Sequence, residues 1–191
     1  MNAPASLHVP SFPAPKAVSS TRVRDAIDAN YEALWRFLRR LGVDEHEVED
    51  AAQHVLLVFA QRAATVANGA ERSFILGSAV RVASDARKKR ARSREIATGE
   101  PGDARPDPFP NAEEQLVERQ RRRWLDEVLD ALPDDHRAVL VLVDLEEQTM
   151  AETAAVLGIP AGTVASRLRR ARELFEQHAA ELKTRIDGGS R

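Results

Sequence analysis

LGIPAGTVASRLRRAR, residues 157–172, joins a tight turn to a segment whose apolar residues recur with helical spacing. Together with the segment before it, residues 150–157, it has the spacing of a helix-turn-helix motif. Gly158 can adopt the positive φ angle of a helix C-terminus, and Ala154 is small enough for the second helix to approach closely. Val164 can then anchor that helix to the core. The stretch therefore predicts a pair of packed helices, of which the second carries the arginines.

The second helix of this pair, expected over about residues 160–181, has two unlike faces. Its inner face is predicted to carry Val164, Leu168, Ala171 and Phe175. Its outer face carries hydroxyl and guanidinium groups, which can donate hydrogen bonds to base edges and phosphates. We expect the following residues to contact duplex DNA: Thr163, Ser166, Arg167, Arg169 and Arg170. The alternative is a solvated basic helix in an ordinary hairpin. Arg172 lies nearer the core side of the helix, where we expect either a phosphate contact or a structural ion pair.

The composition of the 191-residue chain favours an all-α fold. Hydrophobic residues make up 43% and charged residues 30%, which suffices for one mid-sized domain or two small ones. Aromatic residues are only 5%, so the core must be aliphatic and alanine-rich, as in closely packed helices. Because the net charge is −2, affinity for a polyanion depends on local clusters of basic residues. The sequence has no cysteine, which excludes disulfides and is consistent with a cytoplasmic location.

Proline, glycine and charge divide the chain into two helical domains. Residues 1–21 carry four prolines and no continuous apolar run, so they are predicted to be a disordered tail rather than a signal peptide or a membrane span. Residues 95–111 carry four prolines and two glycines, which predicts a flexible linker. This linker separates an N-terminal domain over residues 22–94 from a C-terminal domain over residues 112–182. Residues 183–191 are expected to form a second tail.

Three amphipathic helices are predicted in the N-terminal domain. Apolar residues recur at steps of three and four in the first helix, which ends at Gly42. Asp44 and Glu47 have the spacing of a capping pair for the second helix, whose first turn is strongly acidic. The third helix starts at about residue 71, and its buried candidates are Phe74, Ile75, Ala79, Val82 and Ala86.

The C-terminal domain is predicted to contain four helices. Residues 116–132 are amphipathic around Trp124, Val128 and Leu129, and Pro133 opens the next helix at DDHRAVLVLVDLEE. The run VLVLV also fits a buried strand, but the helical flanks and the lack of a second strand to pair with favour a helix. The two helices of the helix-turn-helix pair complete the domain.

The segment ALPDDHRAVLVLVDLEEQTMAETAAVLGIPAGTVASRLRRAR, residues 131–172, resembles the promoter-reading region of bacterial extracytoplasmic-function sigma factors. That family has ALP, a short helix with R-x-V-L, and a helix-turn-helix with GIP-x-GTV-x-SRL-x-RAR. Upstream, Glu49, Asp50 and Gln53 match the family's ED-x-x-Q element, and SFILGSAVRVASDARKKR resembles its helix that ends in a basic cluster. The resemblance covers residues 24–181 and implies a two-domain, all-α sigma factor.

The resemblance also implies a surface for the downstream promoter element. Residues 81–94 hold seven basic side chains and one acid, which suits a strand of promoter DNA, the alternative being a solvated helix end. The loop over residues 65–70 corresponds to the site where the family captures an unstacked base. Because this loop has no stacking group, polar contacts are expected there. The predicted residues are Asn68, Phe74, Arg81, Arg87, Lys88, Lys89 and Arg90. Phe74 stands where the family usually has Trp, and Ala165 where it often has Lys, which bears on sequence preference.

The acidic second helix implies a protein partner. Its charge repels DNA, and by resemblance Glu49, Asp50 and Gln53 contact the clamp of the core RNA polymerase β′ subunit. The apolar segment over residues 139–145 is expected to be mostly core, with any exposed part available to the β flap. The resemblance therefore predicts a chain that binds core RNA polymerase and both double- and single-stranded promoter DNA. It also implies an anti-sigma factor that could clamp the two domains together and hide both DNA surfaces.

No catalysis, cofactor or metal is expected of this sequence. It has no glycine-rich phosphate loop, no H-E-x-x-H motif and no supported Ser/His/Asp arrangement. Asp50 and His54 are four residues apart, but one carboxylate and one imidazole make a poor metal site. The alternative function is a helix-turn-helix regulator that binds DNA as a dimer without polymerase. A helical scaffold is a third interpretation, which leaves the basic clusters unused.

Overall fold

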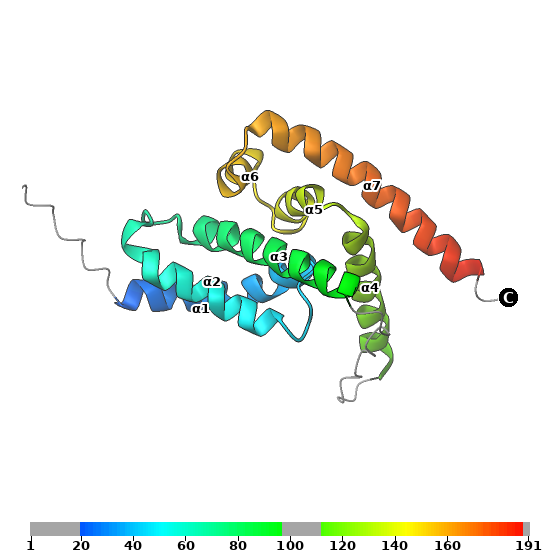
Figure 1. Ribbon diagram of the computed structural model, residues 1–191, viewed down its shortest axis with the longest axis horizontal. Helices are drawn as coiled ribbons and strands as arrows, with labels where there is room; N and C mark the ends of the chain where they lie inside the picture. Colours follow the sequence, from blue (N-terminus) through cyan, green and yellow to red (C-terminus); the bar gives the residue numbers. More distant parts are fainter. Residues whose placement is uncertain (1–19, 97–111, 189–191) are drawn as a thin grey trace, which may run out of the picture.

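The computed structural model describes residues 20–96 and 112–188, and every regular element in these two ranges is helical (Figure 1). The predicted all-α class is therefore confirmed. Most of the expected N-terminal tail and linker lies outside the described residues. Within the described ranges, no helix is both long enough and apolar enough to cross a membrane. We refer to residues 20–96 as the N-terminal half and to residues 112–188 as the C-terminal half.

The N-terminal half is a bundle of three α-helices, each of which contacts the other two. Its elements are α1 (Ser20–Arg40), α2 (Val48–Arg62), the short 3₁₀ helix η1 (Ala63–Thr65) and α3 (Glu71–Ile96). The predicted apolar faces meet in its core, where Leu34, Leu38, Val55, Phe59, Ile75 and Ala79 are all buried. Three other predicted core residues, Phe74, Val82 and Ala86, are only partly buried against this cluster.

The C-terminal half contains four α-helices and one π-helical turn. Its elements are α4 (Ala112–Ala131), α5 (Asp134–Leu140), the π-helix η2 (Val141–Leu145), α6 (Met150–Leu157) and α7 (Ala161–Gly188). The run VLVLV lies in α5 and η2, so its helical interpretation is confirmed and the strand alternative is wrong. Pro133 is the N-cap residue of α5, as its position predicts.

The structure corrects three details of the sequence prediction. The capping pair does not form, because Glu47 makes no side-chain cap on α2 and Asp44 lies 3.3 Å from Arg90 instead. Trp124 does not lie at the centre of the buried face of α4: 37% of it is exposed, whereas Val128 and Leu129 are buried. Finally, α7 runs on to Gly188, through most of the expected C-terminal tail.

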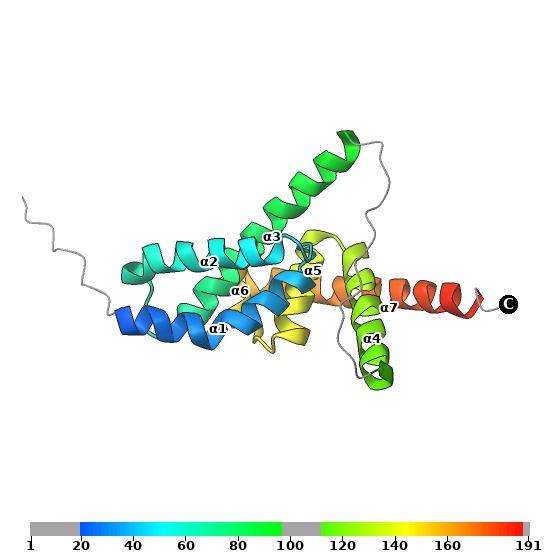
Figure 2. The same ribbon diagram turned by 90° about the horizontal axis from the view of Figure 1, so that it is seen from below.

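The two halves pack against each other through contacts of α3 with α6 and of α1 with α4 (Figures 1 and 2). Gly77 of α3 permits the close approach of α6, because a Cβ atom there would lie 3.1 Å from the backbone oxygen of Val156. Glu146, with a side chain only 7% exposed, accepts hydrogen bonds from Arg40 at 2.9 Å and from Arg72 at 3.1 Å. One buried carboxylate thus connects the C-terminal half to two helices of the N-terminal half.

A buried arginine marks a second contact between the halves. Arg137 of α5 is 1% exposed, and its guanidinium lies against Gly42 in the turn after α1. Gly42 has a φ angle of 85°, so both its conformation and its surroundings disfavour a side chain. Burial lowers the pKa of Arg137 to about 10, although Asp130, 2.8 Å away, favours the charged form. The group is therefore still a cation at neutral pH.

Candidate nucleic-acid interface

A capping box closes the start of α6, and Gly158, whose backbone N–H donates to the Ala154 oxygen, ends it before the turn to α7. At its start, the Thr149 hydroxyl accepts from the Glu152 backbone N–H, and the Glu152 carboxylate accepts from the Thr149 backbone N–H at 2.8 Å. The Thr149 backbone and hydroxyl donors hold the pKa of Glu152 below its ordinary value. At its end, Gly158 adopts a φ angle of 66° in the left-handed region, as its position predicts. The helix-turn-helix geometry is therefore built by local contacts.

The outward face of α7 carries most of the residues predicted to contact duplex DNA. Ser166, Arg169 and Arg170 are exposed, and Thr163 is half-buried. Arg169 and Arg170 both pair with Glu173, at 2.7 and 3.0 Å. Exposed ion pairs of this kind contribute little stability, so the two guanidiniums can exchange their carboxylate partner for a phosphate or a base edge. The inner face of α7 is as predicted: Val164, Leu168 and Ala171 are buried, and Phe175 is half-buried.

The other three arginines of α7, Arg167, Arg172 and Arg185, are paired with residues outside that helix, and the partner of Arg185 is Glu127 of α4. Arg172 contacts both carboxylate oxygens of Asp144, at 3.0 and 2.6 Å, and so forms the structural ion pair that was one of its two expected roles. Arg167 lies 2.8 Å from Asp135 at the start of α5. Its side chain is 30% exposed, which places it at the border of the outward face.

The basic cluster of α3 is partly neutralised by acids of α3 itself, of the loop before α2 and of α5. Arg81, Lys88 and Lys89 are exposed, and Lys88 lies 4.0 Å from Asp85. Arg90 lies 3.3 Å from Asp44. Arg87 lies 2.8 Å from Asp134, at the start of α5 in the other half. The structure thus leaves part of the predicted DNA surface open and joins part of it to the C-terminal half.

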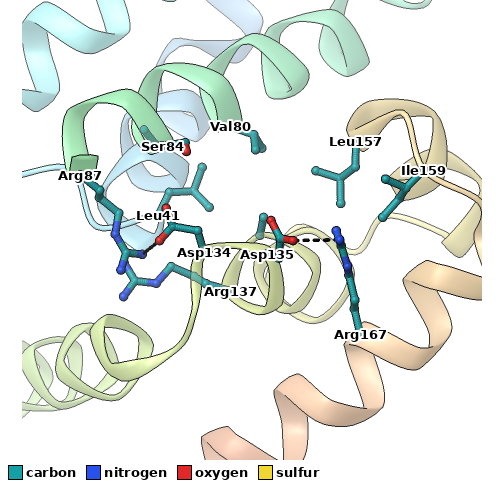
Figure 3. A pocket seen from close by; sticks show the side chains of 12 residues that line it. Leu41, Val80, Ser84, Arg87, Asp134, Asp135, Arg137, Leu157, Ile159 and Arg167 are labelled. Carbon is teal, nitrogen blue, oxygen red and sulfur yellow. Dashed lines mark ion pairs between the residues drawn. The ribbon is translucent and has the colours of Figure 1, made fainter. Parts of the chain in front are cut away.

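A cavity of about 260 Å³ lies where the halves meet (Figure 3). Arg87 of α3 borders one side of it and Arg167 of α7 borders the other. Their partners, Asp134 and Asp135, are consecutive residues of α5. One arginine from each predicted DNA surface is therefore paired with the same acidic helix start.

The loop between α2 and α3 presents one free polar side chain. Asn68 is exposed at its tip and makes no side-chain hydrogen bond to the described part of the chain. Phe74, in the first turns of α3, is half-buried and packs against Phe59, with ring centroids 6.1 Å apart. Backbone oxygens of the loop accept hydrogen bonds from the Arg22 guanidinium. The sequence does not predict this role, because the partners of Arg22 lie more than forty residues away.

The outward face of α2 brings together the three residues predicted to contact polymerase. Glu49, Asp50 and Gln53 are all exposed, and Glu49 accepts hydrogen bonds from the Tyr31 hydroxyl at 2.8 Å and from Gln53 at 3.3 Å. The bond to Glu49 raises the pKa of Tyr31. Leu57, one turn beyond Gln53, is 56% exposed, the largest value among the exposed large hydrophobic residues of the described ranges. An apolar residue beside acids suits a protein partner better than DNA.

Comparisons with known proteins agree with this geometry. Residues 122–175 match the family model for sigma-70, region 4. The chain is 28% identical over 150 residues to the ECF RNA polymerase sigma factor SigE of Mycolicibacterium smegmatis, covering 78% of this chain and 58% of that protein. It is 31% identical over 70 residues to the ECF RNA polymerase sigma factor SigW of Bacillus subtilis, covering 37% of each chain. The chain thus spans less than two thirds of the length of these relatives.

Solved structures share the fold across most of the chain. The sigma factor RpoE from Bartonella quintana, solved with the anti-sigma factor NepR, superposes with a TM-score of 0.64 at 18% identity, covering 83% of this chain and 96% of that one. CnrH, solved with the cytosolic domain of CnrY, gives a TM-score of 0.60 at 18% identity and covers 83% of this chain and 88% of that one. Taken together, these findings show that residues 122–175 match sigma-70, region 4, and that the chain is similar to extracytoplasmic-function RNA polymerase sigma factors in sequence and shares the fold of the two solved structures.

Proposed function

We propose that this chain is a sigma factor that directs core RNA polymerase to specific promoters and assists promoter opening. The observation that carries the proposal is that one chain presents two surfaces of opposite character. The α7 face offers Ser166, Arg169 and Arg170 to DNA, whereas the α2 face offers Asp50, Gln53 and Leu57. A polyanion is attracted by the first surface and repelled by the second, so the second needs a protein partner.

In this proposal the chain contributes binding and leaves catalysis to the polymerase. The α7 residues contact the upstream promoter element as duplex, and the loop around Asn68 and the exposed cations of α3 contact the downstream element when its strands separate. The β′ clamp binds the α2 face. Transcription takes place in the cytoplasm, which is where such a chain would act. Because one structural neighbour was solved with the anti-sigma factor NepR and the other with the cytosolic domain of CnrY, we include an anti-sigma factor among the proposed partners.

A selection experiment tests this function and identifies the promoter elements at the same time. The full chain is mixed with sigma-free core polymerase and a linear duplex library in which an upstream and a downstream block are randomised, and the transcripts are sequenced. The proposal predicts start sites that share two sequence elements and that require both the chain and the core. Core polymerase without the chain is the control.

The alternative, a regulator that acts without being a polymerase subunit, predicts a different result. Such a protein would bind selected duplexes tightly by itself and would not supply initiation to the core enzyme. Tight binding by the chain alone, with no chain-dependent start sites, would favour the regulator. The exposed acidic and apolar face of α2 favours the sigma factor, because a protein that acts by binding duplex DNA alone needs no such surface.

A further inference from the structure

The loop that joins α2 to α3 cannot hold its shape by packing. Residues 63–70 read AATVANGA, and only Ala63 and Val66 are buried. The other side chains are small or exposed, and Gly69 has a φ angle of 85°. A segment with so little buried apolar surface has a low local stability unless hydrogen bonds fix its backbone.

One side chain from α1 supplies those hydrogen bonds. The Arg22 guanidinium donates to the backbone oxygen of Val66 at 2.8 Å, to that of Ala67 at 3.2 Å and to that of Ala63 at 3.4 Å. Its Nε atom donates to Glu71 at 2.8 Å, at the start of α3. Four acceptors spread over the loop and its exit thus converge on one planar guanidinium, and the Arg22 side chain is 24% exposed.

The Glu71 carboxylate completes this arrangement from the other side of the loop. It accepts hydrogen bonds from its own backbone N–H, from Arg22 and from the Gly69 backbone N–H, which together hold its pKa below the ordinary value. It remains charged at neutral pH and keeps the Arg22 fork oriented toward the loop carbonyls. Two backbone hydrogen bonds complete the loop. The Val66 N–H donates to the Ala63 oxygen at 3.3 Å, and the Ala70 N–H donates to the Ala67 oxygen at 3.1 Å.

We infer that Arg22 is a positioning residue, which holds the loop around Asn68 in the conformation that captures an unstacked promoter base. The inference rests on the proposed function for the identity of the ligand. Captured bases are read by groups that must already be in place, because ordering a loop on binding lowers affinity and discrimination. Lysine cannot replace Arg22, because its single ammonium group cannot donate to several separate acceptors as the planar guanidinium does.

The first test measures the loop itself and needs no nucleic acid. Hydrogen exchange of the full chain, followed by mass spectrometry, is compared for wild type, Arg22→Lys, Arg22→Gln and the control Arg24→Gln. Arg24 is exposed on the same helix and makes no hydrogen bond or ion pair with the described residues. Both Arg22 variants should speed exchange at the Val66 and Ala70 amides about tenfold or more, as the loss of a charged hydrogen bond implies, while the α7 amides stay unchanged.

The second test measures base preference with the holoenzyme. Core polymerase carrying each variant is bound to a pool of single-stranded DNA with eight randomised positions, and the retained strands are sequenced. Arg22→Lys and Arg22→Gln should lower the preference at the captured position about tenfold, whereas their affinity for core should match that of Arg24→Gln.

The outcomes of the two tests are distinguishable. Unchanged loop exchange in both Arg22 variants, or full base preference in Arg22→Lys, would overturn the positioning role whatever the function of the chain. A different result is that the wild-type chain neither binds core nor shows any base preference, while the Arg22 variants still exchange faster in the loop. That result would keep Arg22 as the residue that orders the loop. It would reject the proposed function and, with it, the ligand assigned to the loop.

Discussion

At the scale of single residues, the arginines of α7 differ in what they contact. Arg169 and Arg170 share one exposed glutamate, whereas Arg167 and Arg172 pair with aspartates of α5 and η2. Sequence periodicity predicts which of them face outward, because the helical wheel depends only on spacing. It does not predict the partners of Arg167 and Arg172, which lie about thirty residues away in the chain.

Arg170→Ala tests whether this residue reads a base edge. If Arg170 donates two hydrogen bonds to one base, its removal should cost about 1 to 3 kcal/mol of discrimination at a single promoter position. Holoenzyme binding to a panel of single-base promoter variants measures this. An equal loss on every sequence, with a shallower dependence on salt, would make Arg170 a phosphate contact instead.

Glu147 offers a stability test, because it is the only non-glycine residue with a positive φ angle, 55°, in the described ranges. Glu147→Gly should relieve that strain and raise the free energy of unfolding by about 0.5 to 1 kcal/mol, measured by urea denaturation. Gly158→Ala is the opposite case, since φ is 66° there, and it should lower stability by about 1 kcal/mol. A less stable Glu147→Gly variant would contradict the strain argument.

At the scale of elements, the chain forms helices where apolar residues recur with helical spacing, whether or not a side chain caps the helix start. The helix over residues 150–157 and the turn at Gly158 are predicted to the residue, because helix-turn-helix spacing and a left-handed glycine are local signals, whereas the capping box of Thr149 and Glu152 is not predicted. The π-helical turn of η2 is missed, since the VLVDL pattern fits several kinds of helix and the choice follows packing. Arg22 and Glu146 are missed because their partners are distant in sequence.

The α2 face gives the prediction that belongs to this scale. Asp50→Arg should weaken binding to core polymerase tenfold or more, about 1.4 kcal/mol, because it places a cation on the proposed polymerase surface. Fluorescence anisotropy with labelled core measures the change, and the charge reversal Glu176→Arg on exposed α7 is the control. Equal weakening by the two reversals would mean that net charge, rather than the α2 face, governs core binding.

At the scale of the whole molecule, the structure shows the two halves in direct contact. Glu146 connects them by bonding two arginines of the N-terminal half, and Arg137 lies against Gly42. The same contact region holds Arg87 and Arg167, one from each proposed DNA surface. Full use of both surfaces therefore requires these two arginines to leave their aspartates.

Glu146→Ala should loosen the contact between the halves. It leaves two guanidiniums without their carboxylate, at a cost of about 1 to 3 kcal/mol. Because the chain has no cysteine, spin labels can be placed at Ala60→Cys and Ala180→Cys, both exposed, and the distance distribution measured. The variant should broaden that distribution, whereas Glu32→Ala, which removes only an exposed pair within α1, should not. Equal distributions would show that Glu146 does not join the halves.

The most direct test of the proposed sigma-factor function is a titration of the full chain against a fixed amount of sigma-free core polymerase on a selected promoter. If the chain is a sigma factor, no specific transcript forms without it, and the signal rises with the chain and saturates at one chain per core enzyme. Transcription that is independent of the chain, or that falls as the chain is added, would contradict this function.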